Sequence, residues 1–430
     1  MKKKFIIYLL GNFGTKFFSF VLVPIYTSFL LPGEFGTYDY WLTISTLAVS
    51  VIGLQLSQAT YTHLLKFKKK DQECNQIITS SIHILLLQIL IALLMMIVLI
   101  LLNFKYTFYI IPIIILLIIN DFLNQGIARG LEKNEIMVIS SLLLSFFTLT
   151  STVYLLYNNQ YKGYNIEILF IGQIIGVSIG SIYTFLVLLK HKVFSDFTIT
   201  LLPKKQYLML ILFALPLIPN TVSWWIMNVS DRLIIVNYLG ESTNGIYAMA
   251  NRFPSLLLMI NSIVTMVWQD QAIITFEDEN KGLYYTAQLK KYVVVQMIAL
   301  VLFTIIFRIF APLLLQNGFF IAIPYVPLLG LSVVFSGIAS FYGTFYLSSG
   351  HTKGAFYTSI YGALINLIIN LLLIKSFGLY AAVFSTIFAF IAITFIRINK
   401  FRKELDLRYP YMYTILGIII FGLVYIIFYL

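Results

Sequence analysis

Residues 31–41 read LPGEFGTYDYW, and residues 238–247 read YLGESTNGIY. Both stretches carry Gly-Glu and then Gly-x-Tyr, with two extra residues in the second copy. Each copy follows a long hydrophobic stretch and leads into the next one. The copies lie six such stretches apart, and six is even, so both begin on the same side of the hydrophobic stack. The pattern therefore predicts two halves related by a parallel repeat.

Thirteen hydrophobic stretches follow one another along the chain, each close to the roughly 20 residues that span a bilayer as a helix. They lie at about 5–31, 40–65, 77–103, 107–128, 136–157, 166–189, 208–229, 243–272, 292–315, 324–348, 356–375, 378–397 and 411–430. Hydrophobic residues make up 60% of the chain and charged residues 11%, which excludes a soluble globular protein. The sequence predicts an all-α polytopic membrane protein with two six-helix bundles, 1–195 and 196–398, followed by a basic loop and one additional transmembrane helix at 399–430.

Lysine and arginine are concentrated on one side of the predicted membrane. With the N-terminus in the cytoplasm, 22 of the 29 fall in inside segments, and only Lys105, Lys162 and Lys375 fall in outside loops. This bias is the positive-inside pattern of membrane proteins. It predicts outside loops near 31–39, 103–107, 158–165 and 236–243. The net charge of +12 then fits anionic lipid headgroups better than nucleic acid.

The composition argues against a metal site and against an enzyme. Cys74 is the only cysteine, and the four histidines are scattered. We therefore expect no disulfide, no metal and no cofactor. The loops predicted on either side are short, so they offer no platform for the acid/base carboxylates of a glycosyltransferase or polymerase.

Polar side chains follow one face of the first two helices of each half, as their spacing at 100° per residue shows. The members are Asn12, Thr15, Lys16 and Ser19; Asp39, Thr43, Thr46 and Ser50; Asn220 and Ser223, with Trp224 beside them; and Asn251 and Ser255, with Arg252 to the side. Helix packing is one interpretation, since hydroxyl residues often line membrane-helix interfaces. The charges favour a water-filled cavity. On the second interpretation, Lys16, Arg252 and the three asparagines bind substrate and the other members line the cavity.

Lys16 lies about eleven residues into its helix, roughly 16 Å deep at 1.5 Å per residue. It either forms a cationic site for an anionic substrate group or pairs with a carboxylate, Asp39 or Asp121. Asp231 and Arg232 come near the external end of the seventh stretch, where a surface pair is expected.

The repeated glycines are expected to form gating turns. They are Gly33 and Gly36 in the first copy and Gly240 and Gly245 in the second. We expect at least one of Gly33 and Gly36 to have a positive φ, because tight turns commonly need one.

These features together resemble a known family. A first helix with a glycine and a buried cation precedes LPGEFGTY at 31–38; ARGLEKN follows at 128–134, and DR at 231–232 precedes GIY at 245–247. Over about residues 1–398 the chain resembles the Wzx-type polysaccharide flippases of the MOP superfamily, which also holds the MATE exporters and the lipid II flippases. Lys16 and Arg252 match positions where that family tends to carry cavity cations.

The resemblance implies a function and a setting. Such proteins move an undecaprenyl-pyrophosphate-linked oligosaccharide from the inner to the outer leaflet of the bacterial cytoplasmic membrane, by alternating access through a cationic cavity between two lobes. The expected partners are this lipid-linked substrate, the bilayer, and polysaccharide polymerase and chain-length machinery. A coupling ion, H⁺ or Na⁺, is compatible with the resemblance.

Two other functions compete. A MATE-like, ion-coupled exporter of small cationic compounds would need cavity carboxylates, for which Asp39 and Asp121 are the candidates, and the buried cation argues against it. A membrane enzyme such as a glycan polymerase or ligase would need a large external loop, which the spacing of the hydrophobic stretches does not predict.

Overall fold

The computed structural model describes residues 2–67, 71–158, 163–276, 281–348 and 352–430. The side chains of residues 2–10, Asn12 and Asn220, among others, lie outside that description. The described ranges are helical and contain no strand, which confirms the predicted all-α class.

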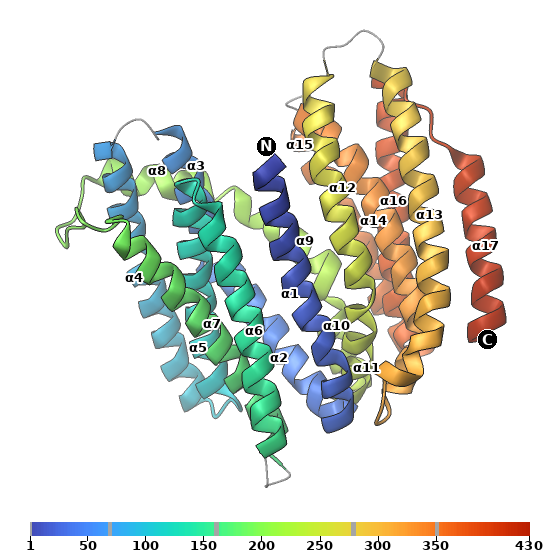
Figure 1. Cartoon of the computed structure of the whole chain (residues 1–430), viewed down its shortest axis with the longest axis horizontal. Coiled ribbons are helices and arrows are strands. Elements are labelled where there is room, and N and C mark those ends of the chain that lie inside the picture. Colours follow the sequence, from blue (N-terminus) through green and yellow to red (C-terminus); the bar gives the residue numbers. More distant parts are fainter. Residues whose placement is uncertain (1, 68–70, 159–162, 277–280, 349–351) are drawn as a thin grey trace. The chain divides into compact units, whose positions relative to one another are not determined.

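The chain folds into two compact units, drawn from blue to red along the sequence in Figure 1. Unit 1 comprises Met1–Leu22 and Trp41–Val222, and unit 2 comprises Val23–Tyr40 and Ser223–Leu430. Three helices are divided between the units, because the boundaries fall inside them: α1 (Lys2–Phe29), α2 (Pro32–Ile52) and α9 (Leu217–Val229).

Unit 1 is built around a tightly packed pair of helices, α6 and α7. Its remaining elements and bounds are α3 (Leu56–Lys66), α4 (Asp71–Leu101), α5 (Thr107–Asp121), the π-helical η1 (Phe122–Ala128), α6 (Asn134–Asn158), α7 (Asn165–Lys190) and α8 (Lys204–Ala214). Glycines on α7 let the two backbones approach: a Cβ on Gly176 would lie 1.9 Å from the Thr148 hydroxyl. Small residues at such crossings are how membrane helices associate closely.

Unit 2 has an aromatic core. Its elements are α10 (Asp231–Leu239), α11 (Glu241–Arg252), α12 (Pro254–Ile274), α13 (Lys281–Leu314), the 3-10 turn η2 (Phe319–Ala322), α14 (Tyr325–Ser348), α15 (Thr352–Phe377), α16 (Leu379–Leu405) and α17 (Tyr411–Tyr429). Trp268 of α12 stacks on Phe341 of α14 at 4.1 Å and donates to its carbonyl, joining the two helices.

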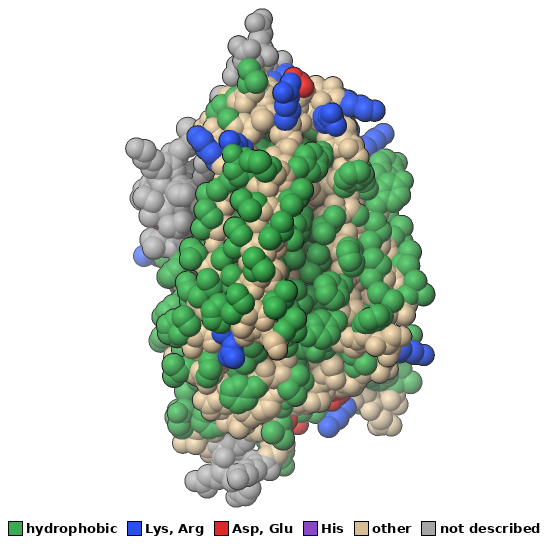
Figure 2. All heavy atoms as spheres, turned by 90° about the vertical axis from the view of Figure 1, so that its right-hand side faces the viewer, with side chains coloured by type: hydrophobic (Ala, Val, Ile, Leu, Met, Phe, Trp, Pro, Cys, Tyr) green, Lys and Arg blue, Asp and Glu red, His purple; other side chains and the backbone are tan. Residues whose placement is uncertain are grey.

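The chain is a multi-pass membrane protein. Among the described residues, ten helices are long and apolar enough to cross a bilayer, or eleven when α2 and α3, bent by 47°, count as one span. The other two predicted stretches coincide with α1 and with α11–α12. Figure 2 shows a broad hydrophobic face with most of the visible lysine and arginine at one end and a few toward the other. Such a face suits contact with lipid, and basic ends suit the headgroup region.

Helix α17 is the predicted additional helix. It lies beside α13, where the Tyr429 hydroxyl donates to the Thr304 carbonyl at 2.7 Å and Arg308 Nε donates to the Phe428 carbonyl at 2.8 Å. These bonds attach the last helix to unit 2.

The expected turns at 31–39 and 236–243 are mostly helix. Helix α2 already begins at Pro32, so Gly33 and Gly36 lie within it, and the expectation of a positive φ at one of them is wrong. In the second copy the break is a single residue, Gly240, with φ 89° between α10 and α11. A single residue with a positive φ, Gly240, is therefore enough to change the chain direction between α10 and α11.

Candidate functional site

The two copies of the repeated motif contact each other within unit 2. A Cβ on Gly36 would lie 1.8 Å from the Glu241 carbonyl oxygen, and a Cβ on Gly245 would lie 1.8 Å from the Pro32 carbonyl oxygen. The first turn of α2 and the first turns of α11 therefore cross backbone to backbone. Gly36 and Gly245 are therefore needed for the close approach of the two helices and not for a turn.

Polar bonds fix this crossing on both sides. The buried Asn244 donates to the Gly36 carbonyl at 2.9 Å, and the Thr37 hydroxyl donates to the Glu241 carboxylate. Glu34 accepts the Leu31 backbone N–H at 2.8 Å, at the start of α2. Glu34 thus acts at the start of its own helix, whereas Glu241 binds α2 across the crossing.

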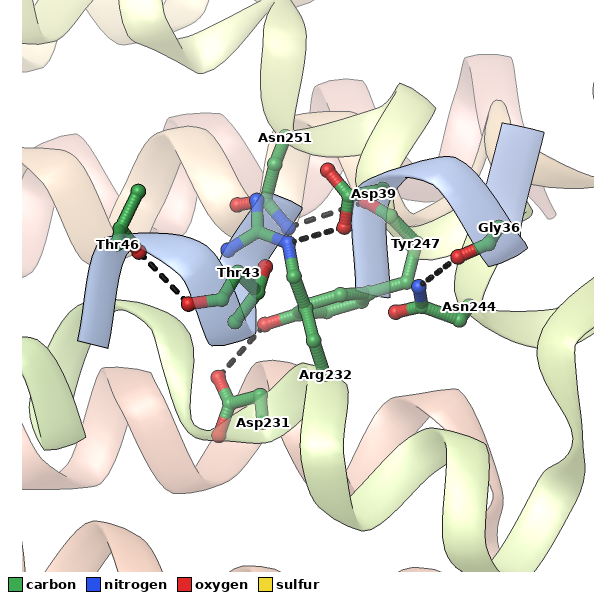
Figure 3. A network of polar contacts seen from close by, with 9 residues as sticks. All are labelled: Gly36, Asp39, Thr43, Thr46, Asp231, Arg232, Asn244, Tyr247 and Asn251. Atoms are coloured by element: carbon green, nitrogen blue, oxygen red, sulfur yellow. Dashed lines mark hydrogen bonds and ion pairs between the residues drawn. The ribbon is translucent and has the colours of Figure 1, made fainter. Parts of the chain in front are cut away.

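Asp39 lies three residues after Gly36 in α2 and forms an ion pair with Arg232 of α10 (Figure 3). The Arg232 Nε and Asp39 Oδ2 atoms are 2.7 Å apart. The two side chains are only 16% and 15% exposed. A pair this well shielded is strongly coupled, because removing one partner leaves a poorly solvated charge behind.

The expected surface pair between Asp231 and Arg232 is wrong. Asp231 is 2% exposed and accepts three hydrogen bonds: from Asn370 Nδ2 at 2.7 Å, Tyr247 Oη at 2.8 Å and Thr386 Oγ1 at 3.0 Å. Successive residues at the start of α10 point in different directions, so Arg232 reaches Asp39 while Asp231 faces α15 and α16. Hydrogen bonds to the carboxylate offset its desolvation.

Arg252 ends α11 among aromatic rings. Its guanidinium lies 5.1 Å from the ring centroids of both Tyr26 and Phe35, which belong to the same unit. Cation–π contact of this kind stabilises a half-buried guanidinium.

The predicted polar faces behave partly as packing surfaces. Several hydroxyls donate to a carbonyl three or four residues back. Three of these bonds stay within one helix: Ser19 to Thr15, Thr46 to Thr43 and Ser50 to Thr46. The fourth, Ser255 to Arg252, joins the start of α12 to the end of α11. Thr43 is buried, whereas Lys16 and Thr46 are exposed on their helices. Such hydroxyls still offer lone pairs as acceptors.

The remaining predicted residues are spread over both units. Asn251 donates to the Tyr247 carbonyl at 3.1 Å, and Ser223 and Trp224 are half-buried on α9. The side chains of Asn12 and Asn220 lie outside the described residues. Of the two carboxylates considered for Lys16, Asp39 pairs with Arg232 and Asp121 accepts a hydrogen bond from Ser57.

The sequence analysis missed the partners of Asp231. Asn370 and Thr386 lie on α15 and α16, whose stretches are almost uniformly apolar. The available signal was Asn366 and Asn370, two amides four residues apart on one helix face in an otherwise hydrophobic span. Both are fully buried.

Comparison with known proteins decides the family. Residues 1–269 match the model of the family described as polysaccharide biosynthesis protein. The chain belongs to this family. A comparison with curated proteins found no match.

The fold of this polysaccharide biosynthesis family member is that of MOP-type transporters. It is similar to an inward-facing multidrug resistance MATE family transporter of the MOP superfamily, with TM-score 0.72 and 12% identity, covering 93% of this chain and 94% of the other. It is also similar to the lipid II flippase MurJ in an inward closed conformation, with TM-score 0.73 and 16% identity over 100% and 98% of the two chains. These likenesses confirm the predicted membrane-transporter fold.

Proposed function

We propose that this chain moves an undecaprenyl-pyrophosphate-linked oligosaccharide from the inner to the outer leaflet of the bacterial cytoplasmic membrane, for surface polysaccharide assembly. The observation that carries the proposal is the match to a polysaccharide biosynthesis family in a chain made of membrane-spanning helices. A pathway that assembles polysaccharide needs a protein that moves glycans across the membrane, since a glycan cannot cross hydrocarbon without losing its hydrogen bonds to water. The related fold of a lipid II flippase supports the same task.

The cationic side chains of Lys16 and Arg252 suit this substrate. Lys16 lies deep in α1, and Arg252 is held by two aromatic rings at the end of α11. A pyrophosphate needs cations, and Lys and Arg are its usual protein ligands. The amides and hydroxyls of the striped helices suit the sugars, and the polyprenyl chain can stay in lipid. Alternating access by the two units would then expose the substrate to each side in turn.

The direct test uses proteoliposomes that contain lipid-linked oligosaccharide extracted from a strain lacking this gene. Periodate, which does not cross the bilayer during a short exposure, should oxidise only the outer-leaflet glycans of protein-free vesicles. With the purified protein present, we expect nearly all glycans to become oxidised. Oxidation that stops at the protein-free level in vesicles containing folded protein would refute the proposal.

The proposal includes an energy source. Two sets of vesicles test which ion drives net movement of the glycan: one set has only an H⁺ gradient and the other only a Na⁺ gradient.

Partnership with a polysaccharide polymerase and with chain-length machinery is proposed on the same reasoning, because a flipped repeat unit must next be joined to others. Co-purification after crosslinking in the native membrane tests that association.

A further inference from the structure

A polar pocket lies wholly within unit 1, where α2 breaks from α3. Its volume is about 370 Å³, and its polar lining consists of four glutamines, Ser50, Ser57 and Asp121. Small-molecule pockets run from roughly 300 to 1,000 Å³, so the space suits one small ligand. Ser50 is one of the side chains predicted from the sequence to line a cavity.

The helix break and a π-helix create the pocket. Leu54 and Gln55 adopt left-handed backbone with φ 47° and 53°, which bends α3 away from α2 by 47°. The opposite wall comes from the end of α5 and the start of the π-helical η1, including Gln125. Broken helices and π-bulges recur at binding sites, because they expose polar groups that a regular helix keeps paired.

Gln88 shows that the pocket is incomplete as it stands. The side chain is 1% exposed, and its Nε2 donates to the Gly53 carbonyl at 3.1 Å. Its Oε1 has no hydrogen-bond partner among the described residues. A buried amide oxygen in this position lacks a donor that a ligand hydroxyl could supply. Asp121, which accepts from Ser57, presents a second acceptor to the same space.

Unit 2 carries a pocket at the equivalent place in its own half. Its volume is about 340 Å³, and it lies between α12 and α14. Its polar lining consists of Asn261, Ser262, Thr265, Gln269, Ser336 and Ser340. In the predicted repeat, the second hydrophobic stretch corresponds to the eighth and the fourth to the tenth. On that prediction each pocket is lined by the same two stretches of its half, and the unit 1 pocket is also lined by Gln88 of α4, in the third stretch.

We propose that each of these two pockets binds one uncharged sugar ring of the translocated glycan. Amides and hydroxyls both donate and accept, as vicinal sugar hydroxyls require. Neither pocket has a lysine or arginine among its described lining residues, so neither suits the pyrophosphate. Both spaces are far larger than a cation needs when oxygens hold it at roughly 2.3–2.6 Å. The inference rests on the proposed function, since it assigns the glycan part of that substrate.

Two matched substitutions fill the pockets without removing a bond between helices. The Ser50 hydroxyl donates to Thr46 of its own helix at 3.0 Å, and Ser340 donates to Ser336 at 2.9 Å. Ser50→Leu and Ser340→Leu therefore add apolar volume to the pockets and leave the helix contacts in place. Ser28→Leu is the control, because Ser28 is exposed and makes the same kind of bond to Ile25 at 2.9 Å.

Saturation-transfer NMR on the full-length protein in nanodiscs measures the binding, with glucose, N-acetylglucosamine and glucuronate as separate probes. We expect saturation of the two neutral sugars, a reduction in each single variant, loss in the double variant, and no change in Ser28→Leu. Glucuronate should saturate less than glucose because of Asp121, and Asp121→Asn should narrow that difference. Gln58→Leu and Ser262→Leu replace either serine variant whose unfolding midpoint shows that it has not folded.

Two outcomes overturn the inference: no saturation of either neutral sugar by the wild type, or full saturation in the folded double variant. Periodate assays on the same preparations separate the two proposals. Flipping without sugar binding removes the pocket assignment alone. Sugar binding without flipping removes the proposed function, and with it the role of the pockets in transport, and leaves them only as sugar sites.

Discussion

Gly36 shares with Gly245 the closest approach of a neighbouring backbone among the described glycines. The hydrogen that stands in place of a Cβ allows the Glu241 carbonyl to approach, and a methyl group there would lie 1.8 Å from that oxygen. The obstructing atom is backbone, so no rotamer change relieves it. We expect Gly36→Ala to destabilise the protein by about 3 kcal/mol or more, at the upper end of overpacking costs. Thermal unfolding of the purified protein measures this.

Gly33 provides the matched control for Gly36→Ala. It lies three residues earlier in the same helix, and a Cβ on it would meet nothing within 4 Å. Alanine has the higher helix propensity, so Gly33→Ala should be neutral or stabilising by about 0.5 kcal/mol. Equal unfolding midpoints for the two variants would show that the crossing of α2 and α11 is not as close as described.

Lys16 is the residue on which the charge argument depends. If it binds the pyrophosphate, Lys16→Ala should abolish flipping while the protein still folds and inserts, and Lys16→Arg should retain part of the activity. Lys375→Ala, which removes an exposed cation at the end of α15, should leave flipping unchanged. Periodate protection in proteoliposomes measures all three. A folded Lys16→Ala variant that flips at the wild-type rate would remove Lys16 from the substrate site.

The role of a residue could be predicted only where its position accepts few residue types, such as glycine alone. The repeated Gly-Glu and Gly-x-Tyr pattern pointed to Gly36 and Gly245, but it suggested turns, because a close helix crossing and a turn both select glycine. Asp231 and Arg232 were adjacent in sequence and looked like partners. Their true partners lie on α11, α15 and α16 for Asp231 and on α2 for Arg232, and they are set by tertiary packing that spacing alone does not reveal.

Helix α17 makes a specific prediction at the scale of an element. A Cβ on Gly417 would lie 2.6 Å from the Met297 side chain of α13, so this glycine lets the two helices meet. Gly417→Leu should loosen that contact and lower the unfolding midpoint. Because α17 lies outside the repeat, flipping by the folded variant should persist. Scanning calorimetry and the periodate assay give the two readouts.

Gly422 is the control on the same helix, since a Cβ on it would meet nothing within 4 Å. Gly422→Leu should leave the midpoint near that of the wild type. A folded Gly417→Leu variant that has lost flipping would contradict the view of α17 as an accessory helix.

The elements themselves were largely predictable, because a bilayer admits only segments whose backbone bonds are satisfied internally. Hydropathy therefore located helices in all thirteen stretches. It did not predict the break at Leu54 and Gln55 or the π-helix at η1. Those features leave composition unchanged and depend on partners such as Gln88, whose amide donates to the Gly53 carbonyl at the break.

At the scale of the whole molecule, the distribution of lysine and arginine predicts the orientation. The bias of the loops predicts an N-terminus in the cytoplasm, since basic loops are retained there. Single cysteines test this in a Cys74→Ser background, which removes the one native thiol. Cys74 donates only a weak bond to the Phe67 carbonyl at 3.3 Å, so its loss should be tolerated.

In that background, Lys105→Cys should react with a membrane-impermeant maleimide in intact cells, because Lys105 lies between α4 and α5 in a predicted outside loop. Lys192→Cys, between α7 and α8, should react only after the membrane is opened. Both positions are exposed, so a difference between them reports the side of the membrane and not burial. The reverse pattern would invert the orientation.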